Sequence, residues 1–201
     1  MKKLLFIVLI GLFTINLNAQ KIKLVDGDIS FLKGVKDVGV EFTYEDLTVG
    51  KMSEADYIKN KVAEAEEREP GTGEAWPDQW YGDRPGHYEP KFIELFNDVM
   101  LSEGVTLTES VEATDYMMIV QTNFIEPGFN VGVARKSALI NLVVEWVETD
   151  KPENVLATFT IDKSPGGLPF GGDYDSGVRV GEAYAKAAKY FAKYLLKKNA
   201  F

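Results

Sequence analysis

A pair of strand patterns in the second half of the chain constrains the fold most strongly. From Ala138 to Thr149 the side chains alternate, and one face carries Ile140, Leu142, Val144 and Trp146. A period of two residues is typical of a β-strand with one buried face. Residues 155–162 repeat the pattern after a short turn at 151–154. The two segments are therefore predicted to form an antiparallel hairpin, because so short a turn cannot join parallel strands.

The other expected elements place this hairpin in an α+β fold. Further strands are predicted at residues 22–25, 35–44, 105–108 and 115–125, and helices at residues 54–69, 90–104 and 177–198. We expect a single antiparallel or mixed sheet of four to six strands, with about three helices packed mainly on one face. No linker divides residues 20–201, which are predicted to form a single domain.

The first nineteen residues have the pattern of a secretory signal peptide. Lys2 and Lys3 precede an apolar run over residues 4–12, and Ala19 supplies a small residue for cleavage. The apolar run is short for a membrane anchor, which is the alternative interpretation. The chain contains no cysteine that could carry a lipid anchor. We therefore expect an exported protein, periplasmic or extracellular, that is not a lipoprotein and has no membrane span after cleavage.

Composition excludes several classes of function. The chain has 201 residues, 31 Asp and Glu against 22 Lys and Arg, and a formal net charge of -9. Such an acidic chain lacks the basic surface of a nucleic-acid-binding protein. The absence of cysteine excludes thiol catalysis, disulfides and thiolate metal sites, and a single histidine excludes multi-histidine metal sites. We expect no metal and no cofactor.

Residues 70–90 are predicted to form a long, aromatic-rich loop between two helices. Its glycines and prolines are interleaved with Trp76, Trp80, Tyr81, His87 and Tyr88. These rings could form a platform for a sugar or a peptide, although packing as a small satellite core is the interpretation we favour. His87 could act as a general acid or base with Glu89, but a lone histidine in a loop is more often solvated.

Two further segments have both a functional and an ordinary interpretation. Residues 126–136 join two strong strands, and could be a projecting hairpin that offers Phe129, Arg135 and Lys136 to a partner, or an ordinary long hairpin. The glycine-rich segment 165–172 lacks the Lys and Ser/Thr of a phosphate-binding loop and is interpreted as a mobile connection. The calcium-like spacing that follows lacks its closing glutamate, so Asp175 or Ser176 is predicted to cap the last helix.

Three stretches resemble a family of uncharacterised exported proteins of Gram-negative bacteria. They are Ser30-Phe31-Leu32-Lys33-Gly34, Pro127-Gly128-Phe129-Asn130-Val131-Gly132, and Gly181-Glu182-Ala183-Tyr184-Ala185-Lys186-Ala187. The resemblance implies no activity and no site residue. The order of elements is also similar, in topology only, to the N-terminal domain of the Tol-system propeller protein, which implies interaction with proteins rather than catalysis.

The leading hypothesis is a non-enzymatic binding or interaction module of the cell envelope, whose partner is an envelope protein or a small ligand. The alternatives are a hydrolase that uses His87 or acidic residues, and a structural or assembly subunit. No catalytic residue is nominated. The candidate binding residues are Trp76, Trp80, Tyr81, His87, Tyr88, Phe129 and Arg135.

Overall fold

The predicted hairpin is present at the centre of the sheet. In the computed structural model, which describes residues 20–168 and 172–201, β9 (Ala138–Glu148) pairs antiparallel with β10 (Lys151–Gly166). On its other side β9 pairs antiparallel with β6 (Tyr116–Glu126). The predicted signal peptide lies outside the described residues.

The main sheet is mixed and is larger than expected. Its strand order is β1-β10-β9-β6-β2-β5, where β1 is Lys21–Gly27, β2 is Asp37–Thr43 and β5 is Thr106–Thr108. Strand β2 runs parallel to both β5 and β6. The expectation of four to six strands is wrong, because β3 (Thr48–Val49) and β4 (Met52–Ser53) bring the sheet to eight. Two-residue strands are too short to show alternation in a sequence.

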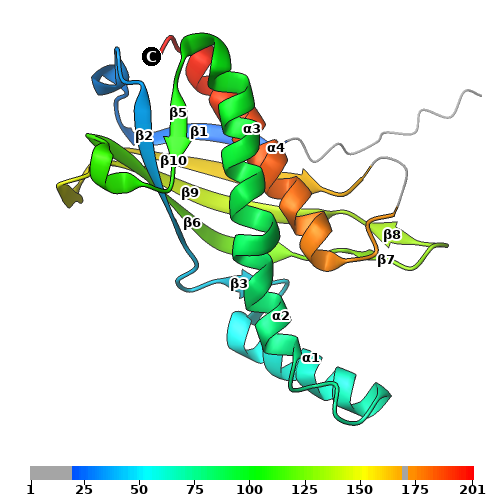
Figure 1. Ribbon diagram of the computed structural model, residues 1–201. Helices are drawn as coiled ribbons and strands as arrows, with labels where there is room; N and C mark the ends of the chain where they lie inside the picture. Colours follow the sequence, from blue (N-terminus) through cyan, green and yellow to red (C-terminus); the bar gives the residue numbers. More distant parts are fainter. Residues whose placement is uncertain (1–19, 169–171) are drawn as a thin grey trace, which may run out of the picture.

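Two long helices cover one face of this sheet, where about three were predicted. They are α3 (Glu89–Met100) and α4 (Ser176–Lys197), which lie side by side across the strands (Figure 1). Helix α1 (Glu54–Arg68) and helix α2 (Trp76–Asp83) extend beyond the edge of the sheet (Figure 1). Short 3-10 turns occur at η1 (Ser30–Leu32), η3 (Leu101–Glu103) and η4 (Val111–Ala113).

The aromatic-rich loop predicted for residues 70–90 is largely helical. Helix α2, a π-helical turn η2 (Arg84–Tyr88) and α3 follow one another without a break. Pro77 stands at the start of α2, where a missing N–H costs nothing. Pro85 and Pro90 cannot donate helical hydrogen bonds, and the wider π turn, in which the Glu89 N–H reaches the Arg84 carbonyl, accommodates them. Prolines that usually indicate a loop here mark a helix with one irregular turn.

The core lies between the sheet and the two long helices. Its largest fully buried side chains include Trp146 and Phe159 from the sheet, Phe92 from α3, and Tyr184 and Phe191 from α4. The ring centroids of Phe159 and Phe191 are 5.0 Å apart. These contacts join the strand pair directly to α4.

Helices α1 and α4 each begin at a side-chain cap, and Asp175 is one of the two caps predicted for the last helix. The Ser53 hydroxyl accepts a hydrogen bond from the Asp56 N–H at the start of α1. The Asp175 carboxylate accepts hydrogen bonds from Gly177 and Val178 at the start of α4. Side-chain caps of this kind satisfy N–H groups that have no partner within the helix. They fix the beginnings of α1 and α4, which border the cleft described next.

Candidate functional site

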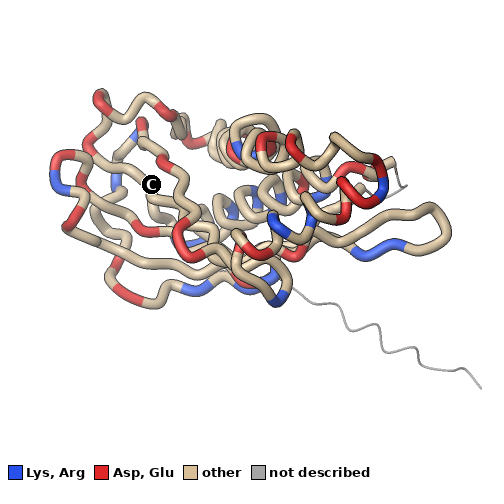
Figure 2. Tube along the Cα trace, turned by 90° about the horizontal axis from the view of Figure 1, so that it is seen from below, with Lys and Arg blue, Asp and Glu red and all other residues tan. Residues whose placement is uncertain are grey.

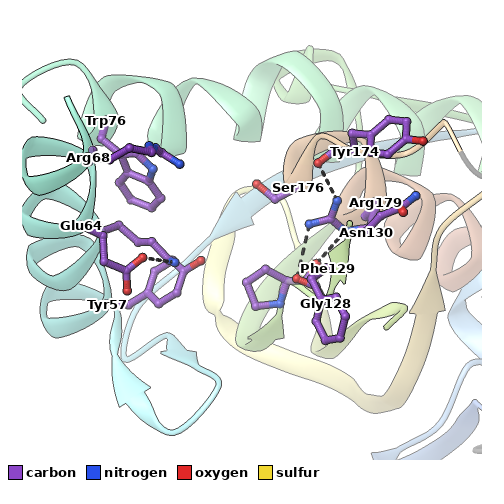
Figure 3. Close-up of a pocket in the computed structure, with 13 residues that line it drawn as sticks. Tyr57, Glu64, Arg68, Trp76, Gly128, Phe129, Asn130, Tyr174, Ser176 and Arg179 are labelled. Carbon is purple, nitrogen blue, oxygen red and sulfur yellow. Dashed lines mark hydrogen bonds and ion pairs between the residues drawn. The ribbon is translucent and has the colours of Figure 1, made fainter. Parts of the chain in front are cut away.

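A cleft of about 470 Å³ separates the helix pair α1–α2 from the first turn of α4 (Figure 3). Three segments that are far apart in the sequence line it: helix α1 with the start of α2, the turn after β6, and the start of α4. The lining residues are Tyr57, Lys61, Glu64, Ala65, Arg68, Trp76, Pro127, Gly128, Phe129, Asn130, Tyr174, Ser176 and Arg179. Pockets where distant segments converge on a few polar groups are the usual place for a ligand.

One wall of the cleft is an aromatic stack. The rings of Trp76 and Trp80 are nearly parallel, with centroids 5.6 Å apart, and Tyr57 lies against both at 5.7 and 5.1 Å. Trp80 is buried behind this stack and donates from Nε1 to the Glu54 carboxylate at 2.6 Å. Because Trp80 packs against both rings, Trp76 and Tyr57 are fixed relative to one another where they border the cleft.

The opposite wall is held by a buried arginine. Arg179 donates to the carbonyl oxygens of Pro127, Gly128, Asp173 and Tyr174, at 3.1, 3.4, 2.6 and 2.9 Å. It thereby joins the turn after β6 to the segment that precedes α4. The Phe129 and Tyr174 side chains, both exposed, extend from these two segments. Figure 3 shows the two walls facing one another across the cleft.

The charged groups of the cleft are mainly positive, although the chain is acidic. Lys61 forms an ion pair with Glu64 at 2.6 Å, and its ammonium lies 5.8 Å from the centre of the Tyr57 ring. Burial raises the pKa of Tyr57 to about 12, so this phenol stays neutral. Arg68, in the last turn of α1, extends toward the cleft (Figure 3), and among the described residues no ion-pair partner faces it. An anionic group in the cleft would meet this guanidinium.

The residues nominated from the sequence are divided among several environments. Trp76 and Phe129 line the cleft. Trp80 and Tyr88 are buried, and Tyr88 stacks on Tyr184 with centroids 5.1 Å apart, so for these two the packing interpretation holds. Tyr81 is exposed and lies below the guanidinium of Arg84, which also binds the Glu54 carboxylate. Arg135 lies outside the cleft, on strand β8 (Arg135–Lys136), and donates to the carbonyl of Leu168.

His87 is not part of the cleft. Its side chain is exposed on the π turn, and its Nε2 lies 3.7 Å from the Asp83 carboxylate, which is longer than a hydrogen bond. Its suggested partner Glu89 instead accepts a hydrogen bond from the Tyr44 hydroxyl at 3.0 Å. No arrangement around His87 therefore brings an acid–base pair to a cavity among the described residues.

Sequence reasoning missed most of the polar residues of the cleft. It did not nominate Lys61, Glu64, Arg68, Tyr174 or Arg179. No local pattern singled out Arg179, whose burial depends on the folded structure. The rest come together only through tertiary packing, which leaves no trace in local sequence.

Two further observations concern metal and membrane. Within residues 20–168 and 172–201, no group of three or more Asp, Glu or His side chains could hold a metal ion. The helices of the same part of the chain are each too short or too polar to cross a bilayer.

Comparison with known proteins finds remote structural likeness. No family model and no curated protein matches the chain. It is similar to the PelC dodecamer of Paraburkholderia phytofirmans, with 9% identity, a TM-score of 0.37, and coverage of 85% of this chain and 98% of that one. It is also similar to a Xanthomonas campestris protein of the family DUF330, with 13% identity, a TM-score of 0.31 and coverage of 83% and 84%. Similarity at this level does not assign a family or a function to the chain.

Proposed function

We propose that the protein is a non-enzymatic binding module of the cell envelope and that the cleft between α1 and α4 is its ligand site. The observation that carries the proposal is the convergence of Trp76, Tyr57 and Arg68 with Phe129 and Tyr174 at one cavity. Rigid aromatic side chains next to a cation bind ligands at a low entropic cost. The predicted signal peptide supports an envelope location.

The chemistry of the cleft favours an acidic oligosaccharide. The C–H face of a sugar ring can pack on Trp76 and Tyr57, and a sugar hydroxyl can bind the hydroxyl of Ser176. A carboxylate on the sugar can form two parallel hydrogen bonds with the guanidinium of Arg68. A purely apolar ligand would instead leave these polar groups without partners, which costs free energy.

Two features argue against the hydrolase alternative. His87 lies outside the cleft, and among the described residues the one carboxylate that lines the cleft, Glu64, is paired with Lys61. Glycoside hydrolysis generally uses two carboxyl groups about 5–9 Å apart across the scissile bond. The lining therefore supports binding without cleavage.

Isothermal titration calorimetry tests the proposal with hexagalacturonate as the probe. We expect Arg68→Gln to weaken binding by about tenfold to a hundredfold, because a charge-assisted hydrogen bond is lost. Trp76→Ala should weaken it comparably by removing the stacking surface. Lys59→Gln removes an exposed charge from the same helix outside the cleft and should leave the affinity unchanged.

A methyl-esterified hexagalacturonate serves as the ligand control, since it keeps the sugar rings and removes the charges. It should bind the native protein no better than hexagalacturonate binds Arg68→Gln. Equal affinities for the native protein and both cleft variants would refute the cleft as the site. Equal affinities for the charged and the esterified ligand would refute the role of Arg68.

A further inference from the structure

A second surface is the tip of the hairpin that follows β6, whose foot at Phe129 and Asn130 borders the cleft. Strands β7 (Phe129–Asn130) and β8 (Arg135–Lys136) form a two-stranded sheet of their own. The hairpin projects from the body of the protein (Figure 1). Its tip is the uncharged sequence Val131-Gly132-Val133-Ala134, and all four residues are exposed.

The tip exposes apolar side chains to an unusual degree. Val133 is 99% exposed and Val131 is 66% exposed, and Phe129, 45% exposed, lies at the foot of the same hairpin. A single exposed valine is ordinary on a protein surface, but adjacent apolar side chains at the end of a projecting hairpin indicate a contact surface.

Positive charge follows directly behind the apolar tip. Residues 127–137 include Arg135 and Lys136 and no acidic residue, in a chain with 31 Asp and Glu (Figure 2). Arg135 and Lys136 line a shallow hollow together with Lys186 of α4. Lys136 is paired with Glu126 at 2.6 Å. This order matches the layers of an anionic lipid bilayer, since apolar side chains can enter the acyl region while cations lie at the headgroups.

The hairpin is held rigidly at its base. Arg179 donates to the carbonyls of Pro127 and Gly128, and the Asn130 side chain donates to the Asp173 carboxylate at 2.7 Å. At the tip, the Val131 N–H donates to the Ala134 carbonyl at 3.0 Å, and Gly132 takes a positive φ of 80°. The tip is therefore pre-organised and does not need to be ordered when it meets a partner.

We propose that this hairpin docks the protein reversibly on an anionic membrane surface, with the side chains of Val131 and Val133 entering the bilayer and Arg135 and Lys136 at the level of the headgroups. The charge of the hairpin, opposite to that of the rest of the molecule, favours a lipid surface over a second copy of this acidic chain. A few small apolar side chains give weak binding, so the contact should form and break rapidly.

Because the chain contains no cysteine, a single introduced cysteine can be labelled specifically in the full-length, purified protein. Val133→Cys is labelled with an environment-sensitive fluorophore and mixed with vesicles of phosphatidylcholine, with or without phosphatidylglycerol. We expect the emission to shift to shorter wavelength with the anionic vesicles. Leu101→Cys, at another exposed apolar position (79%), is the matched control and should not respond.

Two variants separate the contributions of the tip and the charges. In the labelled Val133→Cys protein, Val131→Ser should lower the affinity for anionic vesicles about tenfold, as expected for a buried valine side chain. Arg135→Gln with Lys136→Gln, or an ionic strength of about 0.5 M, should also weaken binding, since salt screens the attraction.

Three results would overturn the proposal. The first is an unchanged emission at position 133 with both kinds of vesicle. The second is an equal response at position 101, which would mean that the protein binds lipid by another segment. The third is a response that depends on protein concentration and not on vesicles, which would assign the tip to a second copy of the chain.

Discussion

The guanidinium of Arg179 is buried and donates hydrogen bonds to backbone carbonyls of two separate segments. We expect Arg179→Met to lower the free energy of unfolding by about 2–3 kcal/mol, because several buried carbonyls lose their donors. Denaturant unfolding measures the loss. Lys189→Met, at an exposed position of the same helix, should change stability little. If the two variants were equally stable, the carbonyl contacts would not hold the cleft wall.

A second prediction at the residue scale concerns Asp83. Burial raises the pKa of this carboxyl above its ordinary value of 3.8, the neighbouring Asp175 raises it further, and His87 opposes the shift. As the pH rises from 3.8, the unfolded chain loses the Asp83 proton before the folded protein does. The free energy of unfolding therefore falls across this window and stays lowered above the folded-state pKa.

The variant Asp83→Asn removes this dependence. It should be more stable than the native protein at neutral pH, and the difference should shrink as the pH falls below the ordinary range of aspartate. Thermal unfolding between acidic and neutral pH measures the difference. Asp78→Asn, at an exposed position of the same helix, is the control. A stability difference that does not depend on pH would contradict the assignment to Asp83.

At the scale of elements, two glycines differ in what surrounds them. A Cβ on Gly166, at the end of β10, would come within 2.0 Å of the Arg179 carbonyl oxygen in α4. We expect Gly166→Ala to lower the free energy of unfolding by about 1–3 kcal/mol, because backbone must move apart. Gly82 in α2 has open space, and Gly82→Ala should stabilise the protein by up to about 1 kcal/mol. Chemical denaturation should show a lower free energy of unfolding for Gly166→Ala and a higher one for Gly82→Ala. Changes in the same direction would contradict the difference in packing around the two glycines.

The elements also show which parts of the fold could be predicted from the sequence. Periodicity and capping residues predicted β9, β10 and α4, because each buries one regular face. They did not predict α2, because Pro85 and Pro90 suggest a loop unless a π turn accommodates them. The cleft was predicted only in part, through Trp76 and Phe129. Arg68 and Tyr174 reach it by tertiary packing that no local pattern encodes.

At the scale of the whole molecule, the helices on the two sides of the cleft differ in how much of their surface is buried. Helix α4 has twelve buried residues and packs against the sheet, whereas in α1 the buried residue is Ala65. Helix α1 is tied to α2 by the contacts of Tyr57 with two tryptophans and by the bonds of Trp80 and Arg84 to Glu54. Local opening costs less free energy where few apolar contacts are broken. The wall that carries Arg68 is therefore the one that can move.

Native-state hydrogen exchange should show this asymmetry. We expect amides of α1 to exchange through local opening at a lower free energy than amides of α4, which should require nearly global unfolding. Glu54→Gln removes the carboxylate that binds Trp80 and Arg84, so it should accelerate exchange in α1 and leave α4 unchanged. Hexagalacturonate should slow exchange in α1 if the cleft is its site, because a ligand that binds the folded form raises the free energy of local opening. Equal opening free energies for α1 and α4 would contradict this prediction, because they would mean that both helices open together.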